Sequence, residues 1–226
     1  MPYDPAQVER IPAMPRADRR VPWPERGIYA VTPEHRSGAE LTAAVASAVE
    51  HGVRAVQYRD KSADRERRRH DAEALLEVCR ARNVPLIIND DVDLALAAGA
   101  DGVHLGRDDE ALAATRSRLG DDAIIGVSCY DEPNRALAAA RNGADYVAFG
   151  SFFPSVTKPG AVRATTGLVA AVRPRIEVPI VAIGGITPEN APPLLECGVD
   201  LLAVVNAIFG APDIARAVRR LARLVA

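Results

Sequence analysis

The sequence predicts one (β/α)₈ barrel of the TIM type over residues 27–226, preceded by a short irregular N-terminal arm over residues 1–26. The first observation behind this prediction is that apolar runs of strand length alternate eight times with helical runs, which is the order of a parallel sheet. The second is the length of 226 residues, which suits a single barrel. The third is a recurring plan of helix end, glycine, small residue, polar residue and apolar strand. A doubly wound open sheet is the main alternative, and it rarely needs eight such even units.

The predicted strands are rich in Val, Ile, Leu and Ala and end in polar or small residues. They cover residues 28–32, 54–59, 85–89, 102–106, 123–128, 146–150, 179–185 and 201–206. Helical composition is clearest over 65–82 and 214–225, and a further helix is predicted to start near Pro188, after the seventh strand. Each copy of the repeat has a glycine where a left-handed C′ cap would end a helix, at Gly52, Gly99, Gly143 and Gly198.

Composition indicates a soluble globular protein, because apolar residues make up 48% of the chain and charged residues 26%. Aromatic residues make up only 4%, so we expect an aliphatic core of the kind that buried parallel strands form. The formal net charge of −2 gives no basic field for nucleic acid. The arginine-rich stretch 65–69 is interpreted as a solvated helix face, because acidic residues interrupt and flank it.

Three features bear on localisation. The cysteines, Cys79, Cys129 and Cys197, are odd in number and far apart, which indicates reduced thiols rather than disulfides or a zinc site. No apolar run is long enough to span a membrane, and residues 1–26 lack the apolar segment of a secretory signal. We therefore expect a cytoplasmic protein without membrane contact. We also expect the N-terminal arm, residues 1–26, to contribute little to the stability of the fold. The sequence leaves open whether the chain forms a homo-oligomer.

Polar residues follow nearly every predicted strand, at the end where barrel enzymes place their active sites. Arg59, Lys61 and Lys158 are cations that suit an anionic ligand. Asp90 and Asp109 follow neighbouring strands, and two carboxylates beside an anion site suggest Mg²⁺, which takes one or two protein carboxylates plus substrate oxygens. The partners that these residues indicate are small phosphorylated molecules.

Neutral hydrogen-bond donors follow the sixth and seventh predicted strands, and they favour a phosphate ligand. Ser155 and Thr157 offer hydroxyls, and Gly184 and Gly185 allow a ligand to approach the backbone amides closely. The predicted helix near Pro188 would aim its N-terminus at the same anion. Barrels often bind phosphate near strands seven and eight.

Simpler explanations exist for several of these residues. Asp90 would also fit a helix cap, and Asp91 and Asp93 are better candidates for helix caps than for metal ligands. Residues 59–61 would also fit a surface ion cluster. His104 is interpreted as a half-buried barrel residue rather than a catalyst.

Five segments resemble the thiamine phosphate synthase family, in unbroken order between Gly27 and Gly210. They read VQYRDK (56–61), PLIINDDVDLALAAGADGVHLGRDD (85–109), IIGVS (124–128), DYVAFGSFFPSVTK (145–158) and VAIGGITPEN (181–190). The resemblance implies a (β/α)₈ barrel that joins hydroxymethylpyrimidine diphosphate to a thiazole phosphate, with Mg²⁺ as cofactor. A related thiazole phosphate tautomerase and a ligand-binding barrel without turnover are the alternatives.

The resemblance also implies roles for individual residues. The pyrimidine diphosphate would be held by Gln57, Tyr58, Arg59, Asp60, Lys61, Asn89, Ser128 and Lys158, of which Arg59, Lys61, Ser128 and Lys158 are expected to be catalytic. The thiazole phosphate would be held by Ser155, Val156, Thr157, Gly185, Val205 and Asn206, and Mg²⁺ by Asp90 and Asp109. The sequence departs from the family pattern at Tyr58, Arg107, Ser155 and Asn206, where members usually have Leu or Ile, Gln, Thr and Ser.

Overall fold

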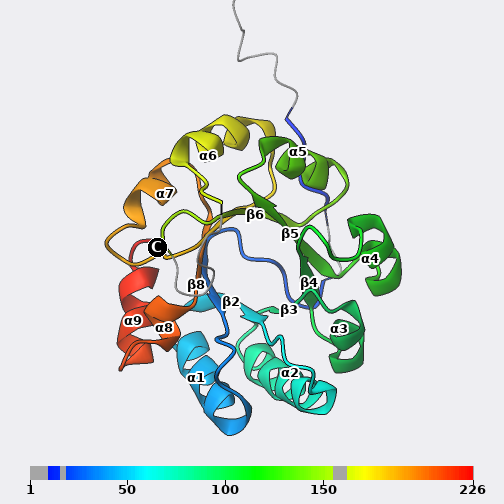
Figure 1. The fold of residues 1–226 in the computed structure, drawn as a ribbon, viewed down its shortest axis with the longest axis vertical. Helices are drawn as coiled ribbons and strands as arrows, with labels where there is room; N and C mark the ends of the chain where they lie inside the picture. The colour runs from blue at the N-terminus through cyan, green and yellow to red at the C-terminus, as the bar shows by residue number, and fades with distance from the viewer. Residues whose placement is uncertain (1–9, 16–18, 155–161, 226) are drawn as a thin grey trace, which may run out of the picture.

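The computed structural model describes residues 10–15, 19–154 and 162–225, and eight parallel strands close into a barrel in sequence order. They are β1 (Gly27–Val31), β2 (Val53–Tyr58), β3 (Leu86–Asn89), β4 (Gly102–Leu105), β5 (Ile124–Tyr130), β6 (Tyr146–Gly150), β7 (Ile180–Ile183) and β8 (Leu201–Val204). Figure 1 shows the helices as a ring around these strands. The predicted barrel is confirmed, and the open sheet is excluded because β1 pairs with β8.

The helices of the ring are α1 (Gly38–Glu50), α2 (Arg65–Arg80), α3 (Val92–Ala98), α4 (Leu112–Leu119), α5 (Pro133–Arg141), α6 (Thr166–Val172), η2 (Arg173–Arg175), α7 (Pro192–Glu196), α8 (Asn206–Phe209) and α9 (Ile214–Ala222). Aspartate side chains cap three of them: Asp64, Asp91 and Asp213 each accept a hydrogen bond from the backbone N–H three residues later. Gly99 ends α3 in the left-handed conformation (φ 66°, ψ 35°), which confirms the predicted cap.

Two boundary differences matter for the mouth of the barrel. β5 continues to Tyr130, two residues beyond the predicted end at Ser128. The predicted helix near Pro188 is wrong, because α7 begins only at Pro192. A turn replaces it, in which Asn190 Oδ1 accepts from the Thr187 N–H at 2.8 Å.

Alternation along the strands divides the apolar side chains between two faces. The inside of the barrel is filled by Tyr29, Val31, Ala55, Ile87, Ile124, Tyr146, Ala148, Val181, Leu201 and Ala203. The larger core lies between the strands and the helices. Both are mainly aliphatic, as predicted, but two tyrosines stand inside the barrel.

The arm packs on the floor of the barrel, the end where the strands begin. Ile11 pairs with Ile176 ahead of β7, and Ile11 and Val21 are 8% and 4% exposed. Trp23 stacks on Tyr146, with ring centroids 3.9 Å apart. In Figure 1 the described part of the arm, in dark blue, passes α5 and turns into the middle of the ring. This packing gives the arm buried contacts that the sequence pattern did not indicate, because Ile11, Val21 and Trp23 are covered without any periodic pattern.

Charged contacts fasten the arm to the same floor. Arg19 and Arg116 both pair with Asp145, with nitrogen–oxygen distances of 2.5 and 2.8 Å. The Asp145 side chain is only 5% exposed and also accepts from the Ile125 N–H at 2.7 Å. Within the described ranges, no helix is both long and apolar enough to cross a membrane.

Candidate active site

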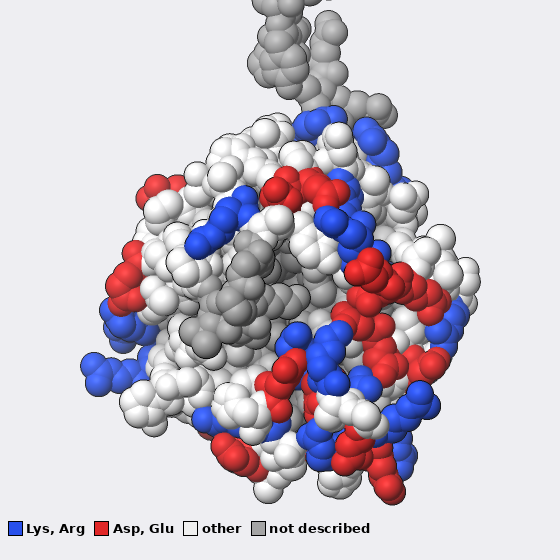
Figure 2. Space-filling model, viewed as in Figure 1, with Lys and Arg blue, Asp and Glu red and all other residues white. Residues whose placement is uncertain are grey.

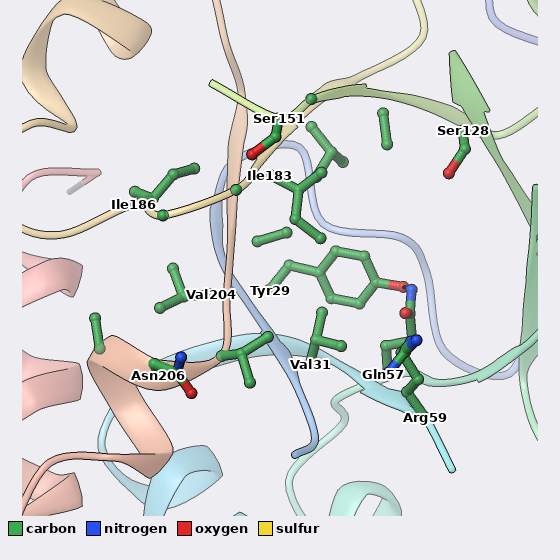
Figure 3. Close-up of a pocket in the computed structure, with 18 of the residues that line it drawn as sticks. Tyr29, Val31, Gln57, Arg59, Ser128, Ser151, Ile183, Ile186, Val204 and Asn206 are labelled. Atoms are coloured by element: carbon green, nitrogen blue, oxygen red, sulfur yellow. Dashed lines mark hydrogen bonds between the residues drawn. The ribbon is translucent and has the colours of Figure 1, made fainter. Parts of the chain in front are cut away.

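A cavity of about 450 Å³ opens at the carboxyl ends of the strands and receives residues from all eight of them. Its polar lining consists of Tyr29, Gln57, Arg59, Asn89, His104, Ser128, Tyr130, Ser151, Thr187 and Asn206. Figure 3 shows the Tyr29 ring pointing toward Gln57, with Ser128 and Asn206 on opposite sides of the view. Because barrel enzymes carry their active sites at this end, the cavity is the candidate active site.

Four hydrogen bonds connect five side chains at the base of the cavity. Gln57 Nε2 donates to Tyr29 OH at 2.8 Å, and the hydroxyls of Tyr29 and Tyr146 are 2.8 Å apart. His104 lies between Tyr146 and Ser128, with Nδ1 at 3.0 Å from Tyr146 OH and Nε2 at 2.8 Å from Ser128 Oγ. Burial raises the pKa of both tyrosines, so both phenols keep their protons at neutral pH.

Arg59 is anchored by the end of β1. Its backbone N–H donates to Thr32 Oγ1 at 2.9 Å, and its guanidinium pairs with Glu34. The Arg59 side chain is 16% exposed and the Glu34 side chain 47%, so this ion pair opens toward solvent on the carboxylate side. A cation in this position can exchange its carboxylate partner for an anionic ligand in the cavity.

Lys61 and Asp90 meet beside a second hollow of about 410 Å³, which Asn89 also lines. Lys61 Nζ pairs with the Asp90 carboxylate, and the Asp90 N–H donates to the His104 carbonyl at 3.0 Å. Asp90 has a φ of 63°, which is uncommon outside glycine and is found more often at functional sites. Figure 2 shows acidic and basic side chains gathered on the side of the mouth that α2, α3 and α4 surround in Figure 1.

Asp109 is held by the short loop after β4. Its carboxylate accepts from the Gly106 N–H, and the next N–H of the loop, from Arg107, donates to Tyr130 OH at 3.1 Å. The Arg107 guanidinium lies 4.7 Å from the centroid of the Tyr130 ring and pairs with Glu132, so its charge is bound away from Asp109.

The two predicted metal ligands follow strands that pair with each other, since β3 and β4 are in register at Asn89 and His104. In the described part of the chain no group of three or more His, Cys, Asp or Glu side chains could hold a metal ion. A metal ion held between these two strand ends would need further oxygen ligands from a substrate or water.

The chain after β6 lies against the end of β7. The Phe153 N–H donates to the Gly184 carbonyl at 3.0 Å. A Cβ atom at Gly184 would overlap Ser151 Oγ, and one at Gly185 would overlap the Pro154 carbonyl oxygen, so both positions require glycine. Close approach at these two glycines was predicted for a ligand; the neighbouring loop also approaches them closely, and both glycines line the main cavity. The helix start predicted near Pro188 is absent, so no helix begins directly after these two glycines.

The structure brings most of the described site residues to one of the two hollows. The main cavity takes Gln57, Arg59, Asn89, Ser128, Gly185, Val205 and Asn206, and the second takes Asp60, Lys61, Asn89 and Asp90. Asp109 lies in the neighbouring loop. Ser155, Val156, Thr157 and Lys158 fall outside the described residues.

Tyr58 and Asp60 have mainly internal partners. Tyr58 is 2% exposed, packs in the core outside the barrel and donates to Asp60 at 3.3 Å, so its side chain does not reach either hollow. Asp60 is paired with Arg67 at 2.7 Å, and its side chain is 6% exposed. Burial by itself would raise the pKa of Asp60, but hydrogen bonds from Ser62 and the charge of Arg67 lower it below its usual value.

The arginine-rich stretch at the start of α2 is only partly solvated. Arg65 and Arg69 are exposed, as predicted for a solvated helix face. Arg67 and Arg68 instead turn toward Asp60 and Asp91, at 2.7 and 2.9 Å, and Arg68 lines the second hollow. The solvated-face interpretation is therefore wrong for these two residues.

Several cavity residues were missed by sequence reasoning. Tyr29 carried a usable signal, because alternation from Val31 at the mouth places Tyr29 inside the barrel. Tyr130 carried no such sequence signal, because β5 reaches Tyr130 only through the pairing of Tyr130 with Phe149 of β6. His104 is 8% exposed, as expected of a barrel residue, but it also lines the cavity and contacts Ser128.

Comparison with known proteins points to one family. A family model described as thiamine monophosphate synthase matches residues 28–208. The chain is 55% identical over 188 residues to a thiamine-phosphate synthase of Azoarcus sp. (strain BH72), covering 83% of this chain and 91% of the relative. It is 50% identical over 204 residues to one of Methylococcus capsulatus, covering 90% of this chain and 91% of that relative.

Solved structures agree with the sequence matches. A thiamine phosphate pyrophosphorylase from Pyrococcus furiosus is similar with a TM-score of 0.80 and 32% identity, covering 89% of this chain and 96% of that one. An orotidine 5′-phosphate decarboxylase from Pyrococcus horikoshii reaches a TM-score of 0.64 at 13% identity, with 87% and 98% covered. The second likeness shows the fold alone.

Proposed function

The chain belongs to the thiamine monophosphate synthase family, and on that premise we propose that it joins hydroxymethylpyrimidine diphosphate to a thiazole phosphate, giving thiamine phosphate and diphosphate. The observation that carries the proposal is the convergence of Gln57, Arg59, Asn89 and Ser128 on one cavity, because the family resemblance assigns all four to the pyrimidine diphosphate. The relatives reported above bear the synthase name, and nothing in them favours a tautomerase or a barrel without turnover.

The reaction needs charge neutralisation more than a base. The C–O bond between the pyrimidine methylene carbon and the diphosphate breaks, and the diphosphate leaves with the electron pair. The aminopyrimidine ring stabilises the resulting cation, and the lone pair of the thiazole nitrogen then forms the new C–N bond. That nitrogen carries no proton to be removed, which fits a cavity whose described polar residues are mainly hydroxyls, amides and an arginine.

The cations of the mouth suit the diphosphate. Arg59 and Lys61 are each paired with a carboxylate, Glu34 and Asp90, that a diphosphate oxygen can replace. In this proposal both cations stabilise the charge that develops on the leaving group, together with Lys158. Ser155, Val156 and Thr157, with Gly185, Val205 and Asn206, hold the thiazole phosphate.

Asp90 and Asp109 are the residues that would hold Mg²⁺, because their carboxylates are hard oxygen ligands at the ends of neighbouring strands. The bound ion would neutralise the leaving diphosphate. Two carboxylates leave most coordination positions to substrate and water, so we expect weak metal binding by the free protein and strong binding with substrate.

We also propose that catalysis belongs to residues 27–226 and that the protein is cytoplasmic. The free state of all three cysteines supports a reducing compartment.

Incubation of the purified protein with both substrates and Mg²⁺ tests the function. We expect thiamine phosphate and diphosphate in equal amounts, and neither when one substrate is omitted. Consumption of the pyrimidine diphosphate without the coupled product would contradict the proposal.

The metal assignment is tested separately by titrating Mg²⁺ into the reaction. Asp90→Asn and Asp109→Asn should each raise the Mg²⁺ concentration needed for half-maximal rate and leave the KM for thiazole phosphate nearly unchanged. Asp108→Asn is the matched control, because Asp108 is exposed and is not a proposed ligand. Full activity after treatment with EDTA, or a larger effect at Asp108, would show that the assignment is wrong.

A further inference from the structure

We propose that Tyr146 is a positioning residue for Ser128, at the centre of a directional hydrogen-bond chain from Gln57 through Tyr29, Tyr146 and His104. The chain holds His104 with its proton on Nε2 and leaves the Ser128 hydroxyl free to donate into the cavity. Only the kinetic consequence of this inference rests on the proposed function. The proton arrangement follows from the geometry at the base of the cavity.

The count of protons begins at Tyr29. Each phenol has one proton to donate, and burial keeps both phenols protonated by raising their pKa. Tyr29 is 1% exposed, so its proton needs an acceptor within the protein. Gln57 contacts Tyr29 through its amide nitrogen, which donates and does not accept. The other hydrogen-bond partner of Tyr29 in the described structure is Tyr146, so Tyr29 donates to Tyr146.

The same count fixes the tautomer of His104. Because Tyr146 accepts from Tyr29, its own proton goes to His104 Nδ1, at 3.0 Å. An Nδ1 atom that accepts carries no proton, so the imidazole is neutral with its proton on Nε2. That N–H then donates to Ser128 Oγ at 2.8 Å.

Ser128 is the open end of the chain. Its oxygen already accepts from His104, so its own proton is available to the cavity that Ser128 lines. In a chain of the reverse direction Ser128 would donate to His104 and present only lone pairs to the ligand. The direction matters for the proposed reaction, because a leaving diphosphate is stabilised by donors and not by acceptors.

Tyr146 controls this end without reaching the ligand. Its side chain is not among the described residues that line the cavity. Its ring stacks on Trp23 of the arm with an interplanar angle of 5° and meets the Tyr29 ring edge-on at 5.8 Å. Loss of its hydroxyl would break the chain in the middle and leave every cavity-lining side chain in place.

The tautomer is measured by ¹⁵N NMR of the histidine rings in the full-length protein without ligands, at a mildly alkaline pH where neutral imidazoles dominate. The chain has four histidines, and loss of one signal set in His104→Gln assigns His104. We expect a pyrrole-type nitrogen at Nε2 and a pyridine-type nitrogen at Nδ1. His51 is the internal control with the opposite pattern, because its Nδ1 lies 2.8 Å from the Ser47 carbonyl, which can only accept. A protonated Nδ1 in His104 would overturn the proposal, whether or not the protein has synthase activity.

The positioning role is measured with Tyr146→Phe, which removes the hydroxyl and keeps the stacked ring. We expect His104 to lose its single tautomer and kcat to fall at least about 5-fold, with the KM for thiazole phosphate within about 2-fold of the parent. Thr115→Val is the matched control, since it removes a buried hydroxyl that has no hydrogen-bond partner within the described residues. It should change neither kcat nor the His104 signals. An unchanged kcat and an unchanged tautomer in Tyr146→Phe would overturn the positioning role.

Discussion

The floor and the mouth of the barrel both carry ion pairs, but the pairs differ in what surrounds them. At the floor, the side chains of Arg19 and Asp145 are 8% and 5% exposed, and Asp145 has Arg116 as a second partner. At the mouth, the side chains of Lys61 and Asp90 are 53% and 24% exposed. A buried carboxylate with several partners is costly to disturb, whereas an open pair contributes little and can exchange partners with a ligand. The barrel therefore carries a buried, multiply paired carboxylate where β6 begins, and an open, exchangeable ion pair where β2 and β3 end.

The largest expected effect is a loss of stability at the floor of the barrel, with the activity at the mouth nearly unchanged. Asp145→Ala leaves Arg19 and Arg116 without their shared carboxylate and removes an acceptor from the Ile125 N–H. We expect the free energy of unfolding to fall by about 3–5 kcal/mol, measured by denaturant titration. The kcat of the protein that remains folded should stay within about 2-fold of the parent. Asp131→Ala, at an exposed position near the start of α5, is the control and should cost less than about 0.5 kcal/mol.

The next largest effect is a loss of activity at the mouth of the barrel, with the stability of the fold nearly unchanged. Arg59→Ala removes the cation that lines the main cavity. We expect kcat/KM to fall by about 100-fold, which corresponds to a loss of about 2.7 kcal/mol of transition-state stabilisation. Thermal unfolding should shift little, because the Glu34 partner is half exposed. Arg107→Ala is the matched control on the same rim, since its guanidinium is bound to Glu132. Equal losses in the two variants would mean that the rim acts only through its general charge.

A third variant tests how strongly the arm belongs to the floor. Trp23→Ala removes the ring that stacks on Tyr146, and we expect a loss of roughly 2 kcal/mol in the free energy of unfolding, below the value for a fully buried Trp because Trp23 is half-buried. Trp23→Phe keeps an aromatic face and should lose less than half as much. An unchanged melting temperature after deletion of residues 1–25 would show that the arm is peripheral.

The smallest effect compares two thiols near opposite ends of the strands. Burial raises the pKa of Cys129, next to Ser128, to about 12, and it raises the pKa of the half-buried Cys197, which precedes β8. A raised pKa keeps the thiol protonated near neutral pH, and the Cys129 side chain is also fully buried, whereas Cys197 is partly exposed. We expect a thiol reagent to label Cys197 first in the native protein, with Cys129 becoming reactive only as the pH rises. Mass spectrometry of partly labelled protein measures the order, and rapid labelling of Cys129 at pH 8 would show that β5 opens at the mouth.

The sequence predictions succeeded where the structure depends on residues close together in the chain, and failed where it depends on contacts made in the folded protein. The N-cap of α3 by Asp91 and its end at Gly99 were predictable, because caps depend on a few neighbouring residues. The helix near Pro188 was not, because Asn190 ties that segment into a turn through Thr187 and Gly185. The convergence of Gln57, Asn89 and Ser128 on one cavity was predictable, because all three lie near the ends of parallel strands.

The sequence by itself determined the eight strand–helix units, the family and the set of polar residues at the mouth. Hydrophobic periodicity, the positions of glycine and proline, and short motifs are all local properties of the chain. The tertiary structure decided which of those residues meet. Trp23 and Tyr146 are 123 positions apart in the chain and stack on the floor, and His104 connects Tyr146 to Ser128 only because β4, β5 and β6 are neighbours in a closed barrel. No local pattern records such contacts, since burial and hydrogen-bond satisfaction act on atoms that closure of the barrel brings together.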